Sequence, residues 1–227
     1  MAQNTEITAA QVKQLREMTG AGMMDCKRAL TESDGDLEKA KDWLRAKGMA
    51  RAADKAGRTA NEGIVEAYVH GGGVSGQKLG VLVEVNCESD FVAKTDDFKQ
   101  LAREIALQVA GRSPLYVRRE DVPPVVVERE RAVFATQAAD KPEAIREKII
   151  EGKLDAFFSE VCLLDQPYVR DEKGRKKVHE LITDAVAKLG ENITVARFAR
   201  FQVGETAAVI GTSSGGSEDG AAAPSPG

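Results

Sequence analysis

An acidic side chain and a large aromatic ring stand next to each other at Asp90 and Phe91, inside residues 86–92. A strand-like run ends just before this stretch, and a helix-like run begins near Asp96. A corner between two regular elements is a place where a rigid scaffold presents side chains outward. We interpret the pair as a wedge for another protein rather than as a catalyst; a capped corner with Phe91 in the core is the alternative.

Two adjacent methionines, Met23 and Met24, form a second candidate for protein recognition. They follow a break in helical pattern at residues 19–22, and Met23 is expected to share a helix face with Cys26 and Leu30. Both thioethers cannot face the inside of a small bundle, because neighbouring helical side chains point in different directions. Flexible thioethers on a surface suit the binding of a protein partner. The alternative interpretation is that the methionines belong to the core of the bundle and residues 19–22 form an ordinary turn.

The sequence lacks residues that a phosphate-binding loop or a hydrolase active site would need. The glycine-rich residues 71–76 have the glycine spacing of a phosphate loop, but no Lys-Ser/Thr pair follows, and a strand stands where a helix should begin. The two histidines, His70 and His179, are not accompanied by a G-x-S-x-G nucleophile motif. We expect no catalytic residue, no cofactor and no enzyme; an enzyme that uses one of these histidines is a rival hypothesis.

Composition narrows the class of protein further. The chain has 227 residues, 30% of them charged, and a formal net charge of −4, which argues against nucleic acid as a direct ligand. No apolar run approaches the roughly 20 residues of a membrane helix, and the N-terminus has no signal-peptide pattern. Three cysteines stand far apart in the chain, without metal-ligand spacing. We therefore expect a cytoplasmic protein that binds neither metal nor membrane.

The first part of the chain carries helical signals only. Thr8 and Gln11 have the spacing of a capping box, which predicts the start of a first helix. Asp36 follows a turn and is the expected N-cap of a third helix. Gly48 is expected to end that helix as its C-cap. The pattern predicts a compact bundle of three short helices.

The pattern then changes to period two, which is typical of strands, at residues 63–70 and 79–87. These strands are expected to pair as an antiparallel hairpin. Thr95 and Asp140 are expected N-caps of later helices, and Phe198 and Phe201, on opposite faces of a last strand, indicate cover on both of its sides. The later elements are four helices and that strand, at residues 96–111, 124–138, 140–157, 176–189 and 193–203.

The predicted fold class is α+β, with a small antiparallel sheet layered with helices. The elements do not alternate as strand and helix, which argues against a doubly wound nucleotide-binding sheet. The expected units are the N-terminal bundle (1–48), a linker helix (49–61), an α+β core (62–206) and a disordered C-terminal tail (207–227).

Two stretches taken together resemble the translation elongation factor Ts family. They are residues 19–27 and 85–94, which contain the methionine pair and the acid–aromatic pair. The resemblance extends over about residues 5–206. Shorter stretches that agree with the second half of family members are residues 114–122, 147–153, 164–169 and 197–205.

The resemblance implies a bundle of the ubiquitin-associated type and a function as guanine-nucleotide exchange factor for elongation factor Tu, in its GDP-bound and nucleotide-free states. The family's T-D-F-V signature corresponds to Ser89, Asp90, Phe91 and Val92. In the family, this signature enters between helices of the partner's GTP-binding domain and dislodges the bound magnesium. The family's contact positions in the bundle correspond to three residues: Arg16, Met23 and Met24.

The sequence departs from the family pattern in two ways. Ser89 stands where the family usually has Thr, which keeps the hydroxyl group. Long members carry a second core subdomain, an antiparallel helical hairpin and a C-terminal helical module. Here Gly111 runs almost directly into Pro114, so half of the core is expected to be absent, and the Gly/Ser tail is expected in place of the C-terminal module. Short members compensate by dimerising, which implies a homodimer. A general adaptor whose bundle binds ubiquitin or nascent chains is a second rival.

Overall fold

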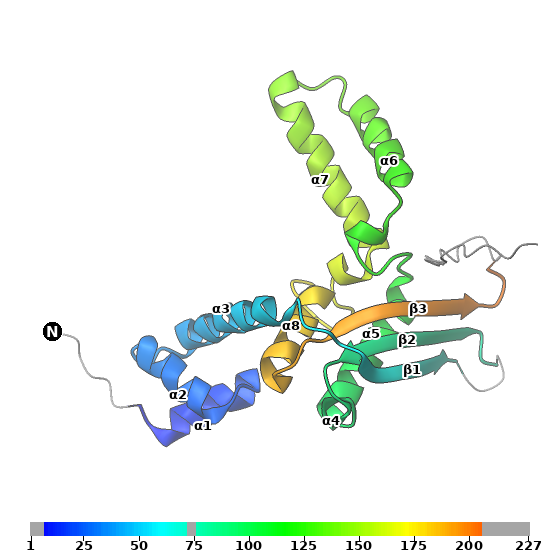
Figure 1. The fold of residues 1–227 in the computed structure, drawn as a ribbon. Coiled ribbons are helices and arrows are strands. Elements are labelled where there is room, and N and C mark those ends of the chain that lie inside the picture. Colours follow the sequence, from blue (N-terminus) through cyan, green and yellow to red (C-terminus); the bar gives the residue numbers. More distant parts are fainter. Residues whose placement is uncertain (1–6, 72–75, 206–227) are drawn as a thin grey trace, which may run out of the picture.

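The computed structural model describes residues 7–71 and 76–205 and has the expected α+β architecture (Figure 1). The predicted tail at 207–227 and most of the glycine-rich loop lie outside the described residues. The elements are, in chain order, α1 (Ala9–Thr19), α2 (Met23–Glu32), α3 (Leu37–Lys55), β1 (Glu62–His70), β2 (Leu79–Cys87), α4 (Asp90–Ala93), α5 (Asp96–Arg112), α6 (Pro124–Gln137), α7 (Glu143–Val161), α8 (Val178–Leu189) and β3 (Thr194–Gln202), with 3₁₀ turns at Arg119–Asp121 and Leu163–Asp165.

The N-terminal bundle forms as its local signals predict. The Thr8 hydroxyl accepts the Gln11 backbone N–H, and the Gln11 side chain accepts the Thr8 N–H, which completes the capping box of α1. The Asp36 carboxylate accepts two backbone N–H groups at the start of α3. Cys26 and Leu30 of α2 are fully buried between α1 and α3. The three-helix bundle and these caps are confirmed.

Helix α3 does not end at Gly48, so that prediction is wrong. The helix continues to Lys55 and includes most of the segment expected as a separate linker helix. Gly48 lies where α3 crosses α8, and a Cβ atom there would lie 3.3 Å from the Cβ atom of Ala187. Gly48 therefore allows α3 and α8 to pack closely and does not end the helix. This contact connects the bundle to the rest of the molecule.

The sheet has the order β1–β2–β3, and all neighbours are antiparallel, which confirms the predicted hairpin. Its inner face, with Val81, Val83 and Val85 of β2, is buried against α5, and α8 packs on α5 in the same apolar core. Gly63 has φ +151, and a Cβ atom there would lie 2.2 Å from the carbonyl oxygen of Val85. Only glycine fits at this close approach of the β1 and β2 backbones.

The outer face of the sheet carries apolar side chains that are exposed. It includes Val65, Leu82 and Phe201, one from each strand. Phe198 packs on the main core, but Phe201 is 60% exposed. The expectation of cover on both sides of the last strand is therefore wrong for Phe201.

Helices α6 and α7 pack against each other as a hairpin that projects from the core (Figure 1). The hairpin has its own small apolar core, which includes Phe134 and Ile150. Asp140 does not cap α7, so that prediction is wrong: the N-cap position is Pro142, and Asp140 pairs with Lys141 at 2.9 Å.

Candidate partner-binding surface

The corner between β2 and α5 contains a single helical turn, α4, that the sequence pattern did not predict. Ser89 is its N-cap, and the Ser89 hydroxyl accepts the Val92 backbone N–H at 3.4 Å. The Thr95 hydroxyl donates to the Val92 carbonyl at 2.7 Å and accepts the Phe98 N–H. Phe91 is the second residue of this turn and is 83% exposed. The alternative that placed the ring in the core is wrong.

Asp90 precedes the ring and is also exposed. Its carboxylate forms an ion pair with Lys94, one helical turn later, and the side chains are 54% and 74% exposed. The hydrogen bond to Asp90 raises the pKa of Lys94. Ion pairs this exposed contribute little free energy, because water solvates both charges. The Asp90 carboxylate can therefore exchange Lys94 for a partner group at small cost.

Ser89 and Val92 lie differently from their two neighbours. Both are half-buried. The Ser89 hydroxyl donates to the Glu191 carboxylate at 2.6 Å, and Val92 packs against the main core. Two of the four signature residues thus contact the protein's own fold, while Asp90 and Phe91 extend into solvent.

The bundle presents the other three candidate residues at its surface. Met23 and Met24 are 54% and 77% exposed, and Arg16 of α1 is exposed as well. The expectation that Met23 shares the inner face of Cys26 and Leu30 is wrong, because those two side chains fill the space between the helices. In Figure 1 the α1–α2 end of the bundle and α4 both lie toward the lower edge of the view, whereas the α6–α7 hairpin projects in the opposite direction.

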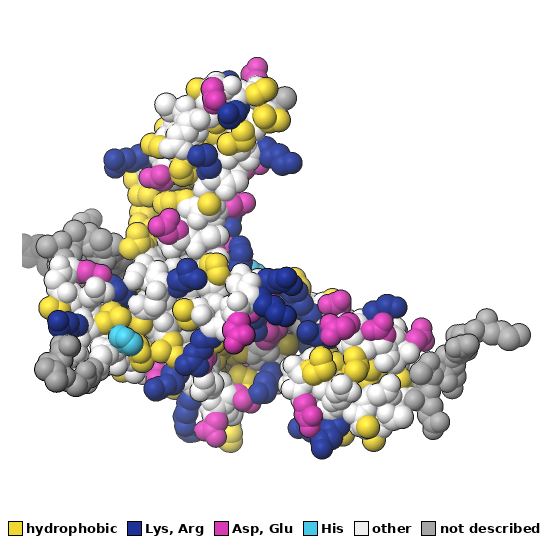
Figure 2. Space-filling view, turned by 180° about the vertical axis from the view of Figure 1, so that it is seen from behind, with side chains coloured by type: hydrophobic (Ala, Val, Ile, Leu, Met, Phe, Trp, Pro, Cys, Tyr) yellow, Lys and Arg dark blue, Asp and Glu magenta, His cyan; other side chains and the backbone are white. Residues whose placement is uncertain are grey.

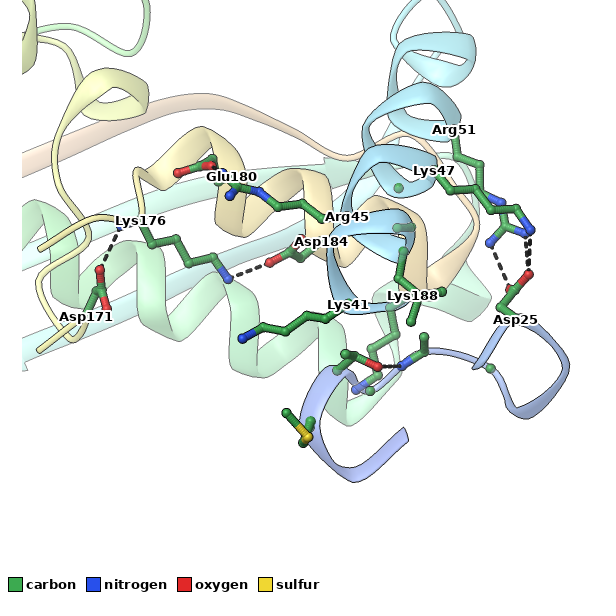
Figure 3. Close-up of a pocket in the computed structure, with 18 of the residues that line it drawn as sticks. Asp25, Lys41, Arg45, Lys47, Arg51, Asp171, Lys176, Glu180, Asp184 and Lys188 are labelled. Atoms are coloured by element: carbon green, nitrogen blue, oxygen red, sulfur yellow. Dashed lines mark hydrogen bonds and ion pairs between the residues drawn. The ribbon is translucent and has the colours of Figure 1, made fainter. Parts of the chain in front are cut away.

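Asp25, which follows the methionine pair, points back toward α3. Its carboxylate accepts hydrogen bonds from Lys47 at 2.8 Å and from the Arg51 guanidinium at 3.0 and 3.1 Å (Figure 3). The hydrogen bond from Arg51, and after it the one from Lys47, lowers the pKa of Asp25. This bidentate contact fixes the first turn of α2, and with it the methionines, on α3.

A groove of about 700 Å³ separates the bundle from α8 and the loop that precedes it. Figure 2 shows Lys and Arg side chains gathered where the bundle meets the rest of the molecule. Most of these charges are paired across or beside the groove: Arg45 contacts Glu180, and Lys176 contacts Asp184 at 2.6 Å (Figure 3). The Arg45–Glu180 pair joins α3 to α8 across the groove, whereas the Lys176–Asp184 pair lies entirely on the core side.

The two histidines and the three cysteines are the remaining side chains that the sequence raised as candidates for chemistry. His70 and the Tyr68 hydroxyl share a hydrogen bond of 2.7 Å, and His179 is exposed on α8. The three cysteines are buried as free thiols, and burial raises the pKa of Cys162 to about 12. Within residues 7–71 and 76–205, no group of three potential ligands could hold a metal ion. No described helix is long and apolar enough to cross a membrane.

Sequence reasoning missed a group of residues that holds the corner from outside. Glu191 and Asn192, in the turn between α8 and β3, contact Glu88 and Ser89. No local pattern points to these contacts, because more than 100 positions separate the two segments. The only signal is that Gly190, with φ +81, ends α8 just before them.

The sequence is similar to a known family over most of its length. The family model described as Elongation factor TS matches residues 48–205. A relative named Elongation factor Ts from Carboxydothermus hydrogenoformans is 58% identical over 201 residues, which are 88% of this chain and 90% of the relative. A relative of the same name from Thermotoga maritima is 56% identical over 200 residues, which are 88% of this chain and 98% of the relative. Because the family model and these relatives cover most of its length, the chain belongs to the elongation factor Ts family.

Proposed function

We propose that this protein is a guanine-nucleotide exchange factor that binds elongation factor Tu in its GDP-bound form and promotes GDP release during translation elongation. The observation that carries the proposal is the exposed Phe91 ring beside Asp90, on a capped corner of a chain from this family. A ring that is 83% exposed contributes little apolar burial to the free protein. It gains free energy when a partner buries it.

In the proposed mechanism, Asp90 and Phe91 enter between helices of the partner's GTP-binding domain and displace the bound magnesium. A divalent cation offsets the charge of the diphosphate, so its loss weakens the hold on GDP. No covalent bond is made or broken, and the protein therefore needs neither catalytic residue nor cofactor. The proposed place of action is the cytoplasm, and free buried thiols suit a reducing compartment.

The free energies show why one ring is insufficient. Changing the ratio of the nucleotide-free to the nucleotide-bound partner from 1:99 to 99:1 requires this protein to bind the nucleotide-free state about 5.5 kcal/mol more strongly. Full burial of one Phe side chain contributes about 1.5–3 kcal/mol. The remainder must come from other contacts, and the exposed Arg16, Met23 and Met24 of the bundle are the proposed source. Since coupling is reciprocal, GDP must weaken the binding of this protein by the same factor.

The experiment that tests the function uses elongation factor Tu loaded with a fluorescent GDP analogue and excess unlabelled GDP. We expect the rate of GDP release to increase with the concentration of this protein and then to saturate. Gel filtration should recover a complex without nucleotide, and GDP with magnesium should dissociate it. Unchanged release at every concentration would exclude the function. Recovery of ubiquitin, but not of elongation factor Tu, in a pull-down would favour the adaptor hypothesis.

We further propose that two copies associate through the outer face of the sheet. A two-fold interface places the same surface of both copies in contact, so that surface must be complementary to itself. An apolar surface meets this condition, whereas a surface of one charge does not. Val65, Val69, Leu82 and Phe201 are 64%, 52%, 47% and 60% exposed on this face. The neighbouring ion pair of Arg197 and Glu84, at 2.7 Å, is internally neutral.

Replacing Leu82 with Lys should convert the dimer into a monomer. The side chain lies on the middle strand, opposite Ala67 and Ala199, so that two introduced charges would meet near the two-fold axis. Sedimentation velocity should show a dimer for the unmodified chain and a monomer for the variant. Val125→Lys, at a 70% exposed position of α6, is the matched control and should remain dimeric. A monomeric parent chain, or a dimeric Leu82→Lys variant, would exclude this interface.

A further inference from the structure

The turn between α8 and β3 holds the corner that carries Phe91 through one carboxylate. The Glu191 carboxylate accepts the backbone N–H of Ser89 at 3.0 Å, the backbone N–H of Glu88 at 3.1 Å and the Ser89 hydroxyl at 2.6 Å. All of these donors lie directly before α4. Hydrogen bonds to an ionised acceptor are stronger than those between neutral groups.

The same turn is held in return by the corner. The Glu88 carboxylate accepts the Asn192 backbone N–H at 2.6 Å, and this hydrogen bond lowers the pKa of Glu88. The Asn192 amide, which is buried, donates to the Arg58 carbonyl at 2.7 Å, and Arg58 lies 3.6 Å from Glu88. The two turns therefore hold each other, and the segment after α3 is tied to both.

The short length of α4 explains why contacts from another segment matter for its order. The helix has only four residues and few backbone hydrogen bonds of its own, so its order depends on its caps and on contacts with other segments. Fixing the backbone of one residue costs about 1–2 kcal/mol. Val92 and Ala93 hold the later part of α4 in the core, whereas the Glu191 carboxylate holds the residues at its start from another segment. A ring that is already oriented avoids this ordering cost at the moment of binding.

We propose that Glu191 is a positioning residue for nucleotide exchange: its carboxylate fixes the start of α4 so that Phe91 is presented in the orientation that enters the partner. This inference rests on the proposed function. It assigns Ser89 a role inside this protein, as the group through which Glu191 acts, rather than a role as a partner contact.

Helix α8 and the turn after it also contact helix α3 of the bundle. Gly48 of α3 packs on Ala187 of α8, and the Lys55 ammonium donates to the Gly190 carbonyl. Residues 190–192 therefore contact the end of α3 on one side and the Phe91 corner on the other. The same short segment therefore links the Phe91 corner to α3, the helix on which the first turn of α2 is held by the Asp25 contacts.

A double-mutant cycle separates positioning from general damage to the fold. We expect Glu191→Ala to slow saturated GDP release about tenfold when Phe91 is present, because the ring is then no longer held in the orientation that enters the partner. In a Phe91→Ala background the same change should alter the rate by less than about twofold, because the group that it positions is gone. Glu191→Gln keeps one acceptor oxygen and should restore part of the rate. Asp121→Ala, which removes a carboxylate that accepts the Arg118 N–H in a distant turn, should leave the rate unchanged.

Amide hydrogen exchange provides a readout that does not depend on the partner. Glu191→Ala should increase exchange at Glu88, Ser89 and the residues of α4, while the β2 amides stay protected. Equal slowing of GDP release in both backgrounds, or unchanged release by Glu191→Ala with Phe91 present, would overturn the inference. If the unmodified protein itself fails to accelerate GDP release, the proposed function is wrong and the inference is overturned with it.

Discussion

Phe91→Ala should slow GDP release from elongation factor Tu about 30-fold at saturating exchange factor, because about 2 kcal/mol of apolar burial is lost. The ring is 83% exposed in the free protein, so the free protein has almost no contacts to lose. Formation of the complex with the GDP-bound partner should weaken less than the release rate falls, since that encounter can use the bundle contacts. Stopped-flow fluorescence measures the release rate, and its dependence on the concentration of the exchange factor measures the affinity for the GDP-bound partner.

The control for this variant is Ile145→Ala. Ile145 is an exposed apolar residue near the start of α7, 46% exposed, and its replacement should change neither quantity. The melting temperature of Phe91→Ala should equal that of the unmodified chain. A release rate that does not change would exclude the wedge role of the ring. A fall in melting temperature would show that the ring stabilises the fold in solution.

Local signals in the sequence predicted the starts of helices well. The caps formed by Thr8, Asp36 and Thr95 depend on groups within three residues of each other, and all are confirmed. Gly48 and Asp140 carry the same kind of signal, and at both positions the prediction failed. At Gly48, contact with Ala187, far along the chain, uses the glycine for close packing. A local pattern cannot distinguish these two uses of glycine.

The candidate site could be predicted in part for the same reason. The position of Asp90 and Phe91 after a strand and before a helix indicated a corner, and the exposure of Phe91 agrees with it. Residue types alone did not show that Ser89 faces inward, because its partner Glu191 is 102 positions away. Contacts of that range depend on how α8 packs, which no short pattern describes. The same limit applies to the apolar outer face of the sheet.

The simultaneous change of Met23 and Met24 to Ala tests the other proposed surface. The two side chains are 54% and 77% exposed, and each loses about two methylene equivalents of surface that a partner could bury, at about 0.8 kcal/mol each. A total of about 3 kcal/mol corresponds to about 100-fold weaker binding of the nucleotide-free partner. Release at saturating concentration should change much less, because the wedge is intact.

Met49→Ala provides the matched control for this pair. Met49 is 57% exposed on α3, so it loses the same atoms from a comparable environment at a site with no proposed contact. It should bind the partner as the unmodified chain does.

The double variant, Met23→Ala with Met24→Ala, should also keep the melting temperature of the unmodified chain, because Cys26 and Leu30, which are fully buried, form the inner face of α2. A large fall in melting temperature would show that the thioethers stabilise the bundle, and unchanged affinity would show that the partner contacts the protein elsewhere. A loss of affinity with an intact bundle would separate the bundle contact from the Phe91 wedge, because Phe91→Ala mainly slows release.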